Sequence, residues 1–105
     1  MRDTRNPAAD PCGQALETLR ALAPTQLVSL VLSASSSRGR PSILDALRTQ
    51  AGVAHCRISL AETRGVAVRW VDGIVSGSVE DVVDFLTMSR PVLARCHGRT
   101  ELTAA

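Results

Sequence analysis

The order of the apolar patterns along the chain restricts its fold more than any other feature of the sequence. Two runs in which apolar and polar residues alternate, 53–61 and 65–71, follow each other closely, and the short segment Glu62–Gly65 joins them. Alternation of this kind is typical of half-buried strands, and a short connection that contains glycine is typical of a hairpin. We therefore expect the two runs to pair as antiparallel strands.

Segments with the apolar spacing of helices stand on both sides of this pair. They start at Ser42 and Ser78, and each opens with a serine that is followed three residues later by an aspartate. The serine hydroxyl of such a pattern accepts a hydrogen bond from a free backbone N–H at the start of a helix. We expect the first of these helices to end at Gly52 and the second to end or kink at Pro91.

Three further elements complete the predicted order. Residues 27–33 are apolar on both faces and predict a central strand, Asp10–Pro24 carries the apolar stripe of a helix, and 92–97 is assigned to a last edge strand. We therefore predict an α+β fold: a ferredoxin-like βαββαβ two-layer sandwich preceded by an N-terminal helix. In that fold the helices cover one face of the sheet and leave the other open.

The size of the chain fits one domain. A chain of 105 residues, 45% of them apolar, is large enough for a single modest core. We expect a disordered N-terminal segment at 1–9, one α+β domain at 10–97 and a flexible tail at 98–105. No apolar run approaches the ~18 residues that cross a bilayer, and the N-terminus has no apolar leader, so we expect a cytoplasmic protein without a membrane partner.

The charged residues argue against nucleic acid as a partner. All twelve basic residues are Arg, ten acids are interspersed among them, and the formal net charge is only +2. Nucleic-acid affinity depends on a strong positive field, and single-strand binding also uses aromatic platforms. The aromatic residues of this chain are Trp70 and Phe85, and the alternation of 65–71 assigns Trp70 to the core.

The predicted open sheet face is semi-apolar and partly basic. The alternation places on it His55, Arg57, Ser59, Ala67, Arg69 and Val71. Because such faces often receive a second copy or another protein, we expect a homo-oligomer, most simply a dimer, with His55, Arg57, Arg69 and Val71 at the interface. An alternative is an accessory subunit that docks on nucleic acid or on a larger complex through the arginines of this face.

A second candidate site is the serine-rich connection between the first predicted strand and the following helix. A strand that leads through a loop into a helix directs free backbone N–H groups and the positive end of the helix dipole at one point. Serine hydroxyls and guanidinium groups add donors, although the spacings of known phosphate loops are absent. The predicted cradle for a small anionic ligand is Ser35, Ser36, Ser37, Arg38, Gly39 and Arg40. The alternative is a polar connection that binds nothing.

The sequence Arg-Pro-Ser-Ile-Leu-Asp-Ala-Leu at 40–47, followed by Ala-Gly-Val at 51–53, resembles the start of an ACT-type regulatory domain. The resemblance covers about residues 27–86. It implies a ferredoxin-like fold that binds amino acids or similar small ligands at a paired interface. The chain departs from the family pattern at Ser42, where the family has glycine, and at Gly39, where it has an acidic residue.

Both histidines adjoin a cysteine, which raises the alternative of a metal- or redox-linked module. Thiolates and imidazoles suit zinc or copper, and the candidate ligands are Cys12, Cys56, Cys96, His55 and His97. Neighbouring residues of a strand point to opposite faces, and no CxxC pair is present, so we assign no metal and no cofactor. Cys12, in the first turn of a predicted helix, is the candidate for a reactive thiolate.

The sequence does not predict a catalytic centre. Glu80, Asp81 and Asp84 fall within about one helical turn and are interpreted as a cap and a solvated face, and the G-x-S-x-G pattern of a serine nucleophile is absent. The sequence therefore predicts a small non-catalytic regulatory or partner-binding module. Binding of a small anionic or amino-acid-like ligand at the Ser/Arg loop is a further expectation.

Overall fold

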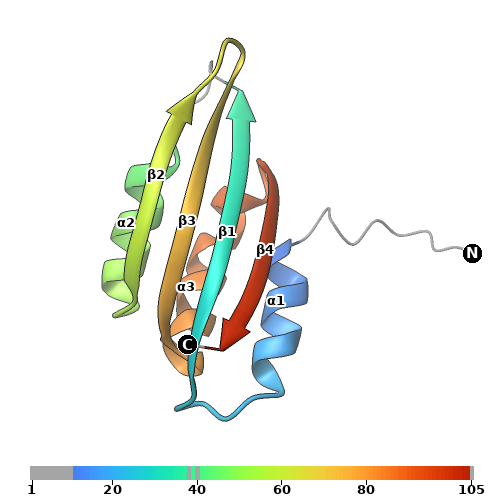
Figure 1. The fold of residues 1–105 in the computed structure, drawn as a ribbon, viewed down its shortest axis with the longest axis vertical. Helices are drawn as coiled ribbons and strands as arrows, with labels where there is room; N and C mark the ends of the chain where they lie inside the picture. Colours follow the sequence, from blue (N-terminus) through green and yellow to red (C-terminus); the bar gives the residue numbers. More distant parts are fainter. Residues whose placement is uncertain (1–10, 38, 40, 105) are drawn as a thin grey trace, which may run out of the picture.

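The computed structural model describes residues 11–37, 39 and 41–104, which form three helices and four strands (Figure 1). The predicted disordered segment at 1–9 lies outside the described residues. In chain order the elements are α1 (Pro11–Arg20), β1 (Leu27–Ser37), α2 (Leu44–Val53), β2 (Arg57–Arg64), β3 (Val68–Ser78), α3 (Val79–Leu93) and β4 (His97–Ala104).

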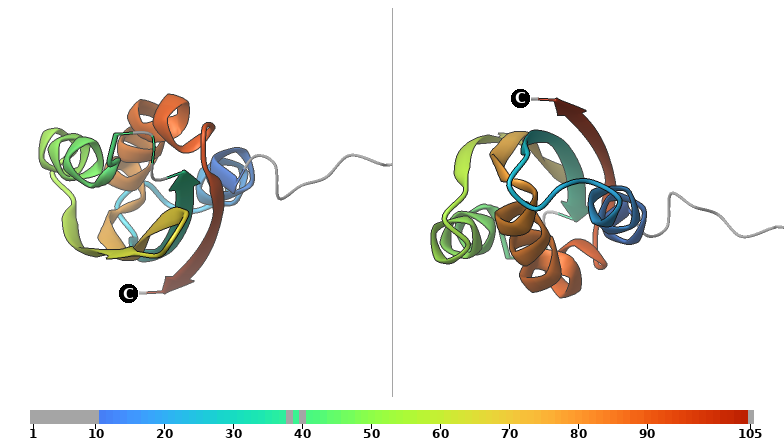
Figure 2. Two further views of the ribbon diagram at one scale, coloured as in Figure 1. Left: turned by 90° about the horizontal axis from the view of Figure 1, so that it is seen from above. Right: turned by 90° about the horizontal axis from the view of Figure 1, so that it is seen from below.

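The strands form one antiparallel sheet in the order β2-β3-β1-β4. Seen from either end of the strands, α1, α2 and α3 lie on the same side of this sheet (Figure 2). Within the described ranges no helix covers the opposite face, which is turned toward the viewer in Figure 1. The chain is therefore an α+β domain with a helix layer on one side of an antiparallel sheet, and this arrangement is compatible with a ferredoxin-like fold.

The core fills the space between the sheet and the helices. Alternate residues of β1 from Val28 to Ala34 are at most 2% exposed, because each points from the central strand into the helix layer. From the other side α3 contributes Phe85 and Leu86, and α1 contributes Leu16 and Leu19 next to β4. Burying a side chain of this size stabilises a fold by about 1.5–3 kcal/mol, so this one-sided core holds the two layers together.

The central strand is longer than predicted, because it includes the serine-rich segment. β1 extends to Ser37, and its residues 28–35 pair with β3 on one side and with β4 on the other. Pairing with both neighbours keeps Ser35 extended, and pairing with β3 alone continues the strand through Ser36 and Ser37. Ser35, Ser36 and Ser37 are therefore strand residues, and the predicted loop begins only after them.

β3 is also longer than predicted, and it runs through two glycine-containing pairs of a kind that is typical of turns. Asp72-Gly73 and Ser76-Gly77 both lie within the strand. Gly73 has φ +156°, and a Cβ built on it would lie 1.9 Å from the carbonyl oxygen of Ser59. The glycine at this position therefore permits a close approach of the β2 and β3 backbones, and it does not mark a turn.

The two faces of β3 are the reverse of the prediction. Val71 is 2% exposed and pairs with the buried Ala34, whereas Trp70 is 39% exposed. The run 65–71 carries apolar residues in both phases, so the alternation alone could not decide between them. The continuation of the strand to Val75, which is fully buried, places Val71 in the core phase and Trp70 on the open face.

The chain beyond α3 also differs from the prediction. Pro91 does not end this helix, which continues to Leu93. The last strand lies at 97–104 and not at 92–97, so most of the predicted flexible tail is ordered. Pairing with β1 explains the difference, because an edge strand of polar residues is stabilised by backbone hydrogen bonds that its own sequence does not reveal.

The two predicted caps have different outcomes. Ser78 caps α3 as expected, because its hydroxyl accepts a hydrogen bond from the Asp81 N–H at 3.2 Å. Ser42 does not form the predicted cap with Asp45, and α2 begins at Leu44 with Ile43 at the N-cap position. The Ser42 hydroxyl instead accepts from the Leu44 N–H and donates to the Glu62 carboxylate of β2 at 2.8 Å.

The C-terminus of α2 places a histidine in the left-handed region of backbone space. The helix passes through Gly52, which was predicted to end it, and His55 has φ +62°. The Cys56 N–H then donates to the Ala51 carbonyl at 2.8 Å and closes the helix end. Glycine is the residue that usually occupies this position, because a Cβ in the left-handed region costs about 1–2 kcal/mol.

Replacing this histidine by glycine should stabilise the protein. His55→Gly removes the unfavourable Cβ but increases the entropy of the unfolded chain, so we expect a net gain of about 0.5–1 kcal/mol in the free energy of unfolding. His55→Ala keeps the Cβ and should leave that free energy close to wild type. Urea denaturation of the three proteins, followed by circular dichroism, tests this, and an equal stability of the glycine and alanine variants would contradict it.

Candidate functional site

The open face of the sheet carries four rows of outward-pointing side chains, one residue from each strand. The strand registers align them across the sheet in the order β2, β3, β1, β4. We name them the arginine row (Arg57, Ser76, Ser29, Thr103), the central row (Ser59, Ile74, Val31, Glu101), the aspartate row (Ala61, Asp72, Ser33, Arg99) and the tryptophan row (Thr63, Trp70, Ser35, His97).

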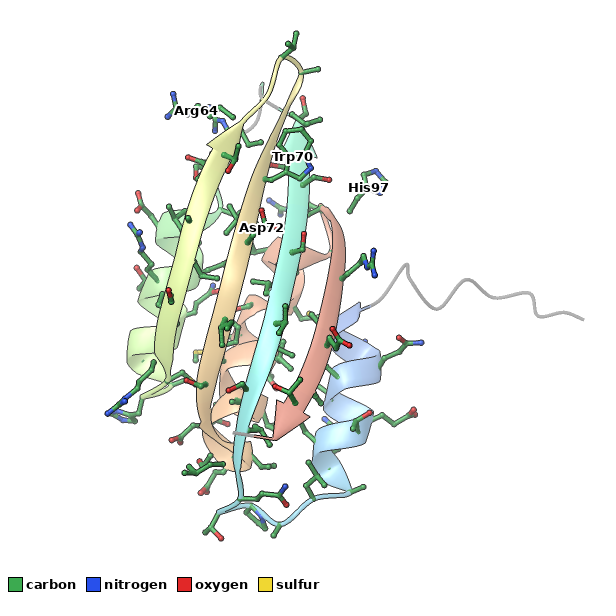
Figure 3. All side chains as sticks on the ribbon, viewed as in Figure 1. Arg64, Trp70, Asp72 and His97 are labelled. Atoms are coloured by element: carbon green, nitrogen blue, oxygen red, sulfur yellow. The ribbon has the colours of Figure 1, made fainter. Side chains whose placement is uncertain are left out.

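Large apolar side chains stand exposed in the middle of this face. Ile74 is 45% exposed and Val31 is 37% exposed, and the two are direct partners across β3 and β1. Trp70 lies two rows away on β3, toward one end of the face, where Figure 3 shows it near the ends of the strands. Exposed apolar side chains that adjoin one another in this way mark a surface suited to contact with another molecule.

Trp70 is held in place by the hairpin between β2 and β3. A Cβ built on Gly65 would lie 2.6 Å from the Cζ3 atom of the indole, so the ring packs directly over this glycine. The Gly65 N–H donates to the Val68 carbonyl at 2.7 Å, which fixes the turn beneath the ring. The indole is therefore both exposed and supported, which lowers the entropy that it would lose on binding.

The described charges of the open face are balanced. Arg57 and Arg99 are exposed on its two edge strands, and Asp72 and Glu101 are the described carboxylates of the same face. Ser33 donates a hydrogen bond to the Asp72 carboxylate at 2.6 Å. The described residues of this face therefore supply no surplus of the positive charge on which the affinity for nucleic acid depends.

The structure places the four predicted interface residues at different sites. Arg57 lies on the open face as expected, and His55 lies in the turn between α2 and β2. Arg69 and Val71 point to the helix side, because they pair with Ser36 and Ala34 in the inward phase of β1. Their assignment to the open face is therefore wrong, and the Arg-bearing face on which the nucleic-acid alternative depended is not formed by these two residues together.

The serine-rich segment is divided between the two faces of the sheet. Ser35 and Ser37 belong to the open side, and Ser36 points toward the helices. The Ser37 hydroxyl accepts a hydrogen bond from the Gly39 N–H at 3.3 Å. Arg38 and Arg40, the charged members of the predicted cradle, lie outside the described residues.

Ser36 lines a pocket of about 190 Å³ at the end of β1. Pro41, Ser42 and Ile43 form one wall at the start of α2, and Val92, Arg95 and Cys96 form another at the end of α3. Beside it, the Glu62 carboxylate accepts from Ser42 and lies 4.0 Å from the Arg64 guanidinium. The pocket thus combines hydroxyl groups, an arginine and apolar carbons on the helix side of the end of β1.

The candidate metal ligands do not come together. In the part of the chain that the structure describes, no group of three or more His, Cys, Asp and Glu side chains is placed to hold a metal ion. Cys12, the predicted reactive thiolate, is 1% exposed on the core side of α1, where a soluble oxidant or electrophile does not reach it. Burial, together with the nearby Asp81 and Asp84 carboxylates, raises the pKa of Cys56 to about 11, so this thiol stays protonated near neutral pH.

The chain was compared with known proteins, and no family model, curated protein or solved structure matches it significantly. Within the described residues, every helix is too short or too polar to cross a bilayer.

Trp70, Ile74 and Val31 are exposed residues that were not predicted from the sequence to lie on the surface. The signal that could have revealed Ile74 is the spacing of Val71, Gly73 and Val75, which gives the core phase of β3 if the two glycine-containing pairs are not treated as turns.

Proposed function

We propose that the protein is a non-catalytic binding module that associates with itself through its open sheet face. The observation that supports this most is the adjoining exposed pair of Ile74 and Val31, with the exposed Trp70 two rows away, on a face that no described helix covers. A second sheet face that packs on this surface removes these side chains from water. Burial of apolar surface contributes about 25 cal/mol per Å², which favours association.

The order of the elements supports a finer description of the fold. From β1 onward the chain follows strand–helix–strand–strand–helix–strand, and the strand order is β2-β3-β1-β4. We propose that this is the ferredoxin-like βαββαβ sandwich, with α1 as an added helix beside β4. The ACT-like sequence at 40–53 agrees with this proposal. The same resemblance supports a regulatory role, in which paired copies of the chain respond to a small ligand.

Ile74→Asp should weaken self-association without unfolding the domain. The change places a carboxylate at the centre of the open face, and in a symmetric pair it acts twice, so we expect the dissociation constant to rise by about 100-fold or more. Val53→Asp on α2, which is also strongly exposed, is the matched control and should associate like wild type. Sedimentation equilibrium over a range of protein concentrations measures the effect.

Two results would count against the proposed function. The first is a wild-type chain that stays monomeric at every concentration tested. The second is a dimer that Ile74→Asp and Val53→Asp weaken equally, because association would then not depend on the open face.

The pocket beside Ser36 supports a second candidate function, the binding of a small anionic or amino-acid-like ligand. The support comes from its position, because Ser36 near the end of β1 and the start of α2 line this pocket. Free N–H groups at the start of a helix and the Arg95 guanidinium suit a carboxylate or a phosphate. This function does not depend on self-association.

Thermal unfolding tests the ligand proposal. Inorganic phosphate or L-aspartate at 10 mM should raise the melting temperature by a few degrees, which corresponds to about 1 kcal/mol for a site with a dissociation constant of about 1 mM. Arg95→Ala should abolish the shift, whereas Arg48→Ala, on the exposed side of α2, should retain it. If sodium chloride at equal ionic strength gives the same shift, or if Arg95→Ala retains it, the pocket does not bind anions.

A further inference from the structure

Each row of the open face complements the same row turned end for end. When a row is reversed, apolar side chains meet apolar or small ones and acids come near bases. We propose that two copies pack face to face about a two-fold axis that runs parallel to the strands, between β1 and β3. This inference rests on the proposed function, and it goes further by specifying which residues of the two copies meet.

Two orientations of the axis have to be compared. Most homodimers are related by a two-fold rotation, which brings the same surface of each copy together. For two sheets packed face to face, this axis lies in the plane between them and runs either along the strands or across them. In both cases the strands of the two sheets are nearly aligned, as in packed antiparallel sheets, and the sheets are about 10 Å apart.

An axis along the strands places each row over the same row of the second copy, but with the strand order reversed. β3 of one copy therefore lies over β1 of the other, and β2 lies over β4. In the central row, Ile74 then faces Val31 of the second copy, and the reciprocal contact forms by symmetry. In the tryptophan row, Trp70 faces Ser35 of the second copy, and the small serine leaves room for the indole. The apolar groups therefore meet apolar or small partners.

The same orientation brings opposite charges together. β2 of one copy lies over β4 of the other, so Arg57 stands over Thr103, and Glu101 is the next outward residue on that strand. Successive outward residues are about 7 Å apart along a strand, which a long arginine side chain can span. Asp72 lies over Ser33 of the second copy, whose neighbour in the row is Arg99, so this acid also meets a base.

An axis across the strands gives poorer contacts. Each strand then lies over its own copy, and an axis through the central row sets Glu101 against Glu101 of the second copy. If the axis shifts to lie between the central and aspartate rows, Glu101 meets Arg99, but Ile74 covers Asp72 of the second copy and buries its carboxylate against an apolar side chain. Like-charge contact and the burial of a carboxylate without a basic partner both oppose binding, so the axis along the strands is favoured.

Charge reversal tests this arrangement. Arg57→Glu sets acid against acid at two symmetric contacts, and Glu101→Arg sets base against base, so each variant alone should dimerise about tenfold more weakly at low salt. An equimolar mixture of the two variants should form the heterodimer with an affinity near wild type, because each contact then joins an acid to a base. Native mass spectrometry separates the species by mass, and the double variant should also recover wild-type affinity.

Disulfide trapping provides a second measurement that does not depend on charge. Val31→Cys mixed with Ile74→Cys should give a crosslinked heterodimer under mild oxidation, and Ile74→Cys alone should crosslink slowly. Rapid crosslinking of Ile74→Cys to itself would overturn the proposed axis, because that contact belongs to the orientation across the strands. Both positions are exposed, and circular dichroism of each variant checks that the fold is retained.

The outcomes separate this inference from the proposed function. A wild-type protein that never dimerises removes the proposed function and this inference together. A dimer that Ile74→Asp disrupts, but whose affinity is the same after Arg57→Glu, Glu101→Arg and their mixture, keeps the open face as the interface and overturns this arrangement.

Discussion

The pairing of β1 with a neighbour on each side is the constraint on which the rest of the structure depends. Residues 28–35 of this strand are matched to β3 and to β4 at once, so its backbone is fixed across the centre of the sheet. Because successive side chains of a strand point to opposite faces, this fixed register sends Val28, Leu30, Leu32 and Ala34 to the helices. It also directs the residues between them to the open face. The register of β1 therefore determines both which side chains form the core and which are exposed on the open face.

The open face follows from this one-sided core. The helices bury one phase of each strand, while the other phase retains Val31, Ile74 and Trp70 among serines and threonines. Two arginines and Glu101 lie on the edge strands of this face, and Asp72 lies on β3. Such a surface is too polar to be a core and too apolar in its middle to be left in water without cost. The proposed association with a second copy would remove this conflict, and the reversed order of the rows would supply partners for the charges as well as for the apolar groups.

Much of the fold could be predicted from the sequence, because the relevant signals are local. The helical stripes, the cap at Ser78 and the hairpin around Gly65 depend on residues close together in the chain. The errors arose where long-range pairing decides: β1 continues through its serines, β4 forms from polar residues at 97–104, and β3 takes the phase that buries Val71. These errors also changed the predicted site, because Trp70 was assigned to the core and Arg69 to the surface. Of the three serines predicted to hold a ligand, Ser36 lines the pocket.

The central claim is that the open face is covered by a second copy, and Trp70 reports on it directly as the single tryptophan of the chain. The measurement is its fluorescence emission as the protein is diluted, alongside sedimentation at the same concentrations. The account predicts that emission moves to longer wavelength as the dimer dissociates, because the 39% exposed indole regains contact with water. Emission that stays constant while sedimentation records the change from dimer to monomer would contradict the account, since the interface would then lie elsewhere.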